Sequence, residues 1–396
     1  MSTHHPSDLP QDFILTGPAI CTESHVLLDH ALVIQKGQIQ KIMPREALEK
    51  NLKLKNSLPH LTYPSSYFVI PGMIDLHIHG SQGSDVMDGT VEALKTIQKS
   101  LVDKGVTGFL ATTMTETKEN ILTALHTVDQ AAHLPSSHAE ILGIHLEGPF
   151  LSEKRMGAQR GELICEPNIA LFNCFQEASG HRIKKVTIAP EYPESLDLIR
   201  HLTSHHVCTS IGHTDATCHE TQAAIDAGAT QATHLFNAMR GVHHREPGPV
   251  TALLLDERVS TELILDGIHL APEIVQLVLK IKGRERVLLV TDAMRAQCLG
   301  NGVFDLGGQP VTVKNGEARL ENGVLAGSVL TLNHALRHMI EMTGCSLLDA
   351  VHMASSNPAK TLNLFDNRGS IAENKRADLV ILNERYEVAQ VIRASI

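Results

Sequence analysis

The stretch Val69-Ile-Pro-Gly-Met-Ile-Asp-Leu-His-Ile-His-Gly80 decides the fold of this chain. Residues two apart on an extended strand project to the same face, so His77 and His79 would direct two imidazole rings to one point. Gly80 lets the chain turn sharply, which places both rings at the carboxyl end of the strand. The stretch therefore predicts a strand that carries a metal-binding pair, although two ordinary buried histidines would fit the same pattern.

From this strand onward, strand-like apolar runs alternate with amphipathic helical patterns. Such alternation is typical of repeated βα units and a parallel sheet. Eight units favour an α/β fold of the closed (β/α)8 TIM-barrel type over an open sheet, and in such barrels the chemistry lies at the carboxyl ends of the strands. The eight predicted strands are Val69–His79, Gly105–Thr113, Glu140–Glu147, Lys185–Ala189, Cys208–His213, Gln231–Leu235, Thr261–Asp266 and Arg286–Asp292.

Both ends of the chain hold short β-like runs outside this alternation, such as His30–Gln35 and Ala377–Leu382. We expect the two ends to build one small β-sandwich domain. The predicted domains are a small β domain of residues 1–68 and 358–396 and a catalytic barrel of residues 69–357.

Composition narrows the function classes. With 396 residues and 42% hydrophobic side chains, the chain can bury a full core. A formal net charge of −10 argues against nucleic-acid binding, because a phosphate backbone needs a basic surface. No apolar run approaches membrane-spanning length and Met1–Pro6 lacks a signal-peptide pattern, so we expect a cytoplasmic protein without a membrane partner. The seven scattered cysteines indicate neither a disulfide framework nor a thiolate zinc site.

Four further polar residues end or closely follow predicted strands: Glu147, His213, His234 and Asp292. Imidazole and carboxylate together suit zinc or iron rather than calcium or magnesium, which prefer oxygen ligands. An aspartate beside such a cation stays ionised and can accept a proton from water that the cation acidifies. Aligned with the first histidine pair, these residues predict a metal centre.

A basic loop, His243-His-Arg-Glu-Pro-Gly248, follows the sixth strand. The forked guanidinium of Arg245 fits phosphate, and backbone N–H groups of Asn237 and Ala238 could point to the same place. A solvated surface loop would explain the same residues. The glycine-bearing segment Leu325–Gly327 could let backbone approach a ligand closely, or form an ordinary turn.

Together these motifs resemble the amidohydrolase superfamily and, within it, the family of N-acetylglucosamine-6-phosphate deacetylases. The resemblance implies a barrel with a small β domain from both termini, a homodimer, and hydrolysis of an N-acetylhexosamine 6-phosphate to the free amine and acetate in amino-sugar recycling. The motifs that carry it are Pro71–Gly80, His145–Phe150, Gly212–Asp215, Thr233–Met239, Arg245–Gly248, Asp266–His269 and Thr291–Met294.

The resemblance also assigns roles to residues. It implies one metal at Glu147, His213 and His234. It implies a second metal at the pair His77 and His79. This second site would share Glu147 with the first, and Asp292 could be a further ligand of it. Zinc or iron, one or two per subunit, is the expected cofactor. Asp292 would move protons between water and the departing nitrogen, and the basic loop would reach the neighbouring subunit's site. The implied substrate-binding residues are Ala158, Gln159, Asn237, Ala238, Arg245, Asp266, His269, Leu325, Ala326 and Gly327.

One departure and three alternatives bear on this interpretation. Gln159 stands where some relatives have histidine, so it can hydrogen-bond a substrate but cannot act as a charged electrophile. A deacetylase for the galacto epimer would differ at one hydroxyl only. A cyclic amidase such as dihydroorotase would use a carboxylated lysine at the end of the fourth strand, whereas Lys184 and Lys185 start that strand. A barrel kept as a sensor or interaction protein should lack a ligand or the acid, and none is missing.

Overall fold

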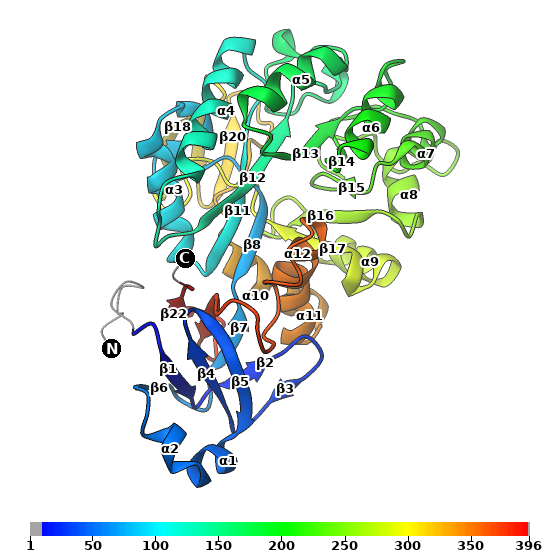
Figure 1. Ribbon diagram of the computed structural model, residues 1–396. Helices are drawn as coiled ribbons and strands as arrows, with labels where there is room; N and C mark the ends of the chain where they lie inside the picture. The colour runs from blue at the N-terminus through cyan, green and yellow to red at the C-terminus, as the bar shows by residue number, and fades with distance from the viewer. Residues whose placement is uncertain (1–9, 395–396) are drawn as a thin grey trace.

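The computed structural model describes residues 10–394. The expectation that the chain lacks a signal peptide rests on Met1–Pro6, which lie outside the described residues. Among the residues described, no helix is long and apolar enough to cross a membrane. Figure 1 shows a large barrel unit above a smaller unit of β-strands.

Eight parallel strands form one sheet in the order of the chain, which confirms the predicted (β/α)8 class. Their side chains are largely buried on both faces; β17, for example, is the apolar run Val-Leu-Leu-Val. The first and last strands close the ring through backbone contacts, since Asp292 N donates to His77 O at 2.8 Å and Ile78 pairs with Ala293. The strands are β8 (Met73–Ile78), β11 (Val106–Thr112), β12 (Glu140–Glu147), β13 (Ile183–Ile188), β14 (Cys208–Ile211), β15 (Gln231–Ala232), β16 (Ser260–Ile264) and β17 (Val287–Val290).

Helices surround the barrel (Figure 1). In the first of them, Thr90 accepts a hydrogen bond from the N–H of Ala93 and so caps the amino terminus. Leu94, Ile97 and Leu101 then recur at helical spacing and are buried. The helices are α3 (Val91–Val102), α4 (Lys118–Ala132), α5 (Ile169–Ala178), α6 (Ser195–Ser204), α7 (Cys218–Ala227), α8 (Gly248–Leu255), α9 (Pro272–Lys282), α10 (Leu332–Thr343), α11 (Leu347–Val351) and α12 (Asn357–Thr361).

Two sheets form the smaller unit, and they draw strands from both ends of the chain. Phe13 and Leu32 from one sheet share a core with Val69 and Leu379 from the other, as in a β-sandwich. The first sheet holds β5 (Gln38–Pro44), β4 (His30–Gln35), β1 (Phe13–Thr16) and β6 (His60–Thr62), and helices α1 (Arg45–Lys50) and α2 (Leu52–Lys55) follow β5. The second holds β22 (Val388–Ile392), β21 (Leu379–Leu382), β7 (Phe68–Pro71), β2 (Ala19–Cys21) and β3 (Val26–Leu27).

The predicted single strand Val69–His79 is wrong, because the structure divides it at Gly72. The part before the glycine is β7, which pairs with β2 and β21 in the smaller unit, and the part after it is β8 of the barrel. A Cβ at Gly72 would lie 2.1 Å from Thr107 Oγ1, so the chain passes too close to β11 for any side chain.

A three-stranded antiparallel sheet follows the last barrel strand, and the sequence patterns did not predict it. It consists of β18 (Gly302–Leu306), β19 (Gln309–Lys314) and β20 (Glu317–Leu320). We call it the inserted sheet. Leu306 and Val311 pack against Met114 and Met294 at the carboxyl end of the barrel. The inserted sheet therefore stands beside the place where barrel strands present functional side chains. A short hairpin, β9 (Gly80–Ser81) and β10 (Ser84–Asp85), follows the first barrel strand.

Candidate active site

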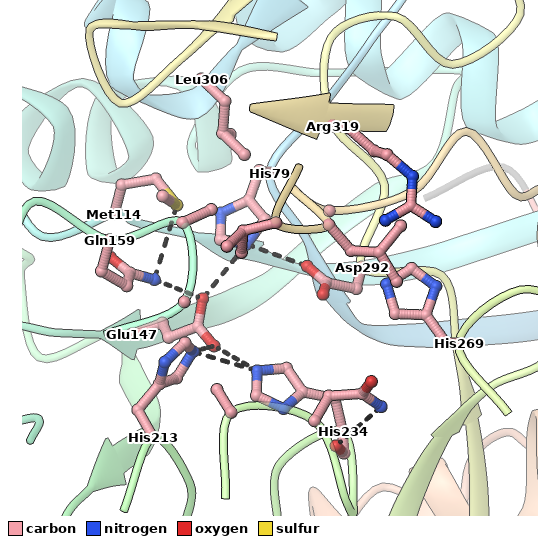
Figure 2. Close-up of a pocket in the computed structure, with 17 residues that line it drawn as sticks. His79, Met114, Glu147, Gln159, His213, His234, His269, Asp292, Leu306 and Arg319 are labelled. Atoms are coloured by element: carbon pink, nitrogen blue, oxygen red, sulfur yellow. Dashed lines mark hydrogen bonds and ion pairs between the residues drawn. The ribbon is translucent and has the colours of Figure 1, made fainter. Parts of the chain in front are cut away.

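Six polar side chains on or just after five of the barrel strands meet at the carboxyl end of the barrel, as Figure 2 shows for five of these side chains. They form two groups, and within each group the ligand atoms lie within 4.8 Å of one another. All six residues are buried. The first group is His77, His79 and Asp292, and the second is Glu147, His213 and His234.

Glu147 joins the two groups. Its Oε1 lies 3.2 Å from Nε2 of His234 and 3.4 Å from Nε2 of His213. Its Oε2 lies 3.2 Å from Nε2 of His79 and 3.4 Å from Nε2 of His77. One carboxylate thus faces two clusters of imidazole nitrogen, which is the arrangement of a bridging ligand.

The backbone is strained at three of these residues. His213, His234 and Asp292 have φ angles of 48°, 29° and 47°, in the left-handed region that residues with a side chain seldom adopt. Each such residue costs roughly 1–3 kcal/mol, and strain of this kind collects at functional sites. All three residues lie two positions after the end of a barrel strand.

The charges around the first group favour a cation. Burial disfavours charge on the imidazoles, but the carboxylates of Glu147 and Asp292 outweigh it and raise the pKa of His77 to about 10 and that of His79 to about 9. Burial would likewise raise the pKa of Asp292, yet the two histidines outweigh it and lower that pKa to about 2. The carboxylates therefore stay ionised and attract positive charge into the site.

The outer nitrogen of two ligands is held by a hydrogen bond. The Nδ1–H of His213 donates to the carbonyl oxygen of Arg155 at 3.0 Å, and Nδ1 of His77 lies 3.2 Å from Oε2 of Glu262. These contacts occupy Nδ1 of each ring and leave Nε2 directed at the centre, where a bound cation would take the place of a ring proton. Nε2 of His77 is buried and lacks a hydrogen-bond partner within residues 10–394. The donor set fits zinc or iron, which take imidazole and carboxylate together.

A cavity of about 370 Å³ opens above these side chains. Seven of the ten predicted substrate-binding residues line it, and the inserted sheet and the segment directly after β20 supply part of the wall. The seven are Ala158, Gln159, Asn237, Ala238, His269, Leu325 and Gly327.

The other three predicted substrate-binding residues do not line the cavity. Asp266 lies behind His269, whose Nδ1 is 2.7 Å from its Oδ2, and therefore orients that ring. Ala326 is buried in the core of the inserted sheet. Arg245 is exposed on its loop, where its Nη1 contacts His244 Nε2 at 2.6 Å, outside the cavity of its own chain.

Both ends of the Gln159 side chain are occupied. Its Nε2 donates to Oε2 of Glu147 at 3.1 Å, and its Oε1 accepts from the backbone N–H of Thr115 at 2.7 Å. The amide therefore fixes the carboxylate of Glu147, which faces both groups. A histidine at this position could carry charge to a substrate, whereas this glutamine acts through hydrogen bonds.

Sequence reasoning missed two sets of residues at or next to the site. Arg319 and Leu306 reach the cavity from the inserted sheet, whose short strands carried no signal that tied them to the site. Lys185 and Glu262 are fully buried inside the barrel. A charged residue within an otherwise apolar strand is a signal that would have found this second pair.

Fold and site together define a metal-dependent hydrolase of the barrel type. Residues 68–395 match the amidohydrolase family, and residues 13–56 match the NagA composite domain. The chain therefore belongs to the amidohydrolase family, whose members hydrolyse amide bonds with the help of a metal.

The chain is similar over most of its length to deacetylases of phosphorylated amino sugars. It is 41% identical to N-acetylglucosamine-6-phosphate deacetylase of Bacillus subtilis (strain 168), across 97% of this chain and 96% of the relative. It is 37% identical to N-acetylgalactosamine-6-phosphate deacetylase of Escherichia coli O157:H7, across 96% and 97%. A mutant N-acetylglucosamine-6-phosphate deacetylase from Mycobacterium smegmatis, solved with N-acetyl-D-glucosamine-6-phosphate, superposes with a TM-score of 0.88 at 33% identity, covering 98% of this chain and 99% of that one.

Proposed function

We propose that this protein hydrolyses the acetamide of N-acetyl-D-glucosamine 6-phosphate to D-glucosamine 6-phosphate and acetate, as part of amino-sugar recycling in the cytoplasm. The observation that carries the proposal is the buried group of four histidines and two carboxylates at the floor of a cavity. The identity of 41% to a deacetylase with this substrate in its name supports the choice of sugar.

One or two divalent metal ions, zinc or iron, held by these two groups of residues would acidify water and polarise the acetamide carbonyl. Asp292 supplies the proton transfers. Its Oδ1 lies 3.3 Å from Nε2 of His77 and 3.2 Å from Nε2 of His79, and the residue lines the cavity, so it can meet both water and substrate. As an ionised carboxylate it accepts a proton from the attacking water and then returns it to the departing nitrogen, as amide hydrolysis requires.

The cavity wall would select the sugar. Asn237 and His269 offer hydrogen-bonding groups, and Asp266 fixes the orientation of the His269 ring. The chain carries a net charge of −10, so selectivity for a phosphate must come from local cations. Arg245 lies outside the cavity of its own chain, so a contact between this arginine and the phosphate would need a homodimer in which its loop reaches the partner's cavity.

The competing functions differ in their support. The galacto epimer is favoured by one observation, the 37% identity to the Escherichia coli enzyme, and remains the second candidate. Two contacts argue against a bridging carboxylated lysine: Lys185 is buried in an ion pair with Glu262, and the carboxylate of Glu147 already faces both groups of histidines. A non-catalytic barrel is disfavoured by the complete set of ligands and the acid.

Acetate release from three substrates tests the proposal. The substrates are N-acetylglucosamine 6-phosphate, N-acetylgalactosamine 6-phosphate and unphosphorylated N-acetylglucosamine, with zinc and iron content measured on the same preparation. We expect the highest kcat/KM for the first. A higher kcat/KM for N-acetylgalactosamine 6-phosphate would make the galacto deacetylase the first candidate. If the metal-loaded protein releases no acetate from any of the three substrates, deacetylation is refuted.

A further inference from the structure

A fully buried ion pair lies inside the barrel next to the metal ligands. Nζ of Lys185 on β13 donates to Oε1 of Glu262 on β16, and neither side chain is exposed. β14 and β15 separate these strands in the sheet, so the pair reaches across the barrel interior. The other carboxylate oxygen, Oε2, lies 3.2 Å from Nδ1 of His77. Lysine, glutamate and histidine thus form a continuous chain that ends at a predicted metal ligand.

Stability alone gives no reason for this pair. Branched apolar residues usually fill the interior of such a barrel. Removing two charges from water costs several kcal/mol per ion, and well-packed apolar residues in place of a buried pair are often neutral or stabilising. A pair kept at this position is therefore better explained by what its free oxygen touches.

The two histidines of the first group are held differently. Nδ1 of His77 faces Glu262, and the ring also meets the edge of His145, whose centroid is 4.5 Å away. Nδ1 of His79 is buried without a hydrogen-bond partner in the described part of the chain. Of these two rings, only His77 has a carboxylate oxygen within hydrogen-bonding distance of Nδ1; the buried carboxyl of Asp85 acts on His79 electrostatically, without a hydrogen bond to it. A neutral imidazole with its N–H at Nδ1 presents a lone pair at Nε2, the atom that faces Glu147 and Asp292.

We propose that Glu262 is a positioning residue for the second metal site. It accepts the Nδ1–H of His77 and so sets the ring orientation and the tautomer that ligates through Nε2, and Lys185 holds the carboxylate in place and balances its charge. The inference rests on the proposed metal centre, and it assigns a role to two residues that touch neither substrate nor metal. Partners of this kind typically contribute about 10–100-fold to metal affinity.

Zinc titration of the metal-free full-length protein, with chelator competition, tests the assignment. Lys185→Met/Glu262→Leu removes both charges, so no single buried ion is left unpaired. We expect wild-type protein to bind two zinc ions per chain, and the double variant to bind the second about 10–100-fold more weakly with the first unchanged. Lys185→Met/Glu262→Gln keeps an acceptor oxygen for the Nδ1–H, also leaves no buried ion unpaired, and should lose less. Ser210→Ala, a buried change in the barrel interior that contacts no ligand in this structure, is the matched control and should leave both affinities unchanged.

Several outcomes would overturn the assignment. If the folded Lys185→Met/Glu262→Leu variant binds zinc at both sites as tightly as the wild type does, the pair is purely structural. If the wild-type protein binds a single zinc ion, the site that Glu262 is said to support does not exist. If the Lys185→Met/Glu262→Leu variant does not fold, ¹⁵N NMR of the zinc-loaded wild type decides the question. The His77 signal is assigned by its loss in His77→Asn. A proton on Nδ1 of His77 supports the proposal, and a proton on Nε2 refutes it. Acetate release by the wild type is scored separately, because an active enzyme with one metal would refute this inference and leave the proposed function standing.

Discussion

The floor and the rim of the cavity are built in different ways. The floor comes from the six candidate metal ligands, five of which line the cavity; all six are buried and lie at or just after the ends of barrel strands. The rim comes from loops and from the inserted sheet, as with His269 and Arg319. In the view of Figure 2 these two residues lie on the opposite side of Asp292 from Gln159. Rigid strands position the groups that need accurate geometry, and variable segments above them face the rest of the substrate.

This contrast separates two kinds of effect. Changes at the floor should remove metal or slow the chemical step for every substrate. Changes at the rim should alter which substrate is used, because a rim residue contacts only the part of the sugar that reaches it. Measurements on phosphorylated and unphosphorylated substrates can therefore assign each residue to floor or rim.

The largest effect is expected for Glu147→Gln. This carboxylate faces both groups of histidines, so its loss weakens both metal sites and should remove nearly all activity. His213→Ala should lose the metal of its own group with a similar loss of turnover. Metal analysis of the purified variants, beside acetate release, checks both. Full metal occupancy with near-normal turnover would show that these residues are not ligands.

Asp292→Asn should retain metal at the group of Glu147, His213 and His234 and still bind substrate, while kcat falls by about 10²–10⁴, the usual scale for lost acid–base catalysis. The amide keeps the shape of the side chain but cannot accept the proton. The measurement is kcat across neutral pH, together with metal content. An unchanged kcat would exclude Asp292 as the group that moves protons.

Arg245→Ala should cost about 2–4 kcal/mol in kcat/KM for the 6-phosphate, because a charged contact to the phosphate is lost, and barely affect the unphosphorylated sugar. Equal losses for both substrates would show that Arg245 has another role.

Mixed subunits then test whether this arginine acts across a dimer. Combining Arg245→Ala chains with Asp292→Asn chains should restore activity, since one site of each hybrid dimer has both an intact Asp292 and an intact Arg245 from the partner. Activity no higher than the sum of the separate variants would place Arg245 in the site of its own chain or outside any site.

Arg319→Met should have the smallest effect, under about tenfold in KM for the 6-phosphate. This arginine lines the cavity, but its Nε already pairs with Glu317 at 2.8 Å and its Nη1 donates to Gly323 O at 2.8 Å. Partly exposed pairs of this kind contribute little. A larger loss than for Arg245→Ala, confined to the phosphorylated substrates, would show that the chain's own inserted sheet binds the phosphate.

Local patterns were sufficient to predict the floor. Alternating side chains and strand endings are properties of short stretches, and they single out the six residues His77, His79, Glu147, His213, His234 and Asp292. The barrel class followed from the same alternation, and the β-sandwich from strands at both ends of the chain. The residue limits of the two domains stay a prediction, and β7 shows that the smaller unit extends to Pro71 in its strand pairing.

Only the tertiary structure decided the features that depend on contacts between residues far apart in the sequence. Gly72 divides a continuous apolar run because Thr107 approaches it from another strand. Lys185 and Glu262 meet across the barrel although their positions differ by 77 residues. The inserted sheet belongs to the cavity only because its core packs on Met114 and Met294. Each of these follows from packing in three dimensions, which no stretch of sequence records by itself.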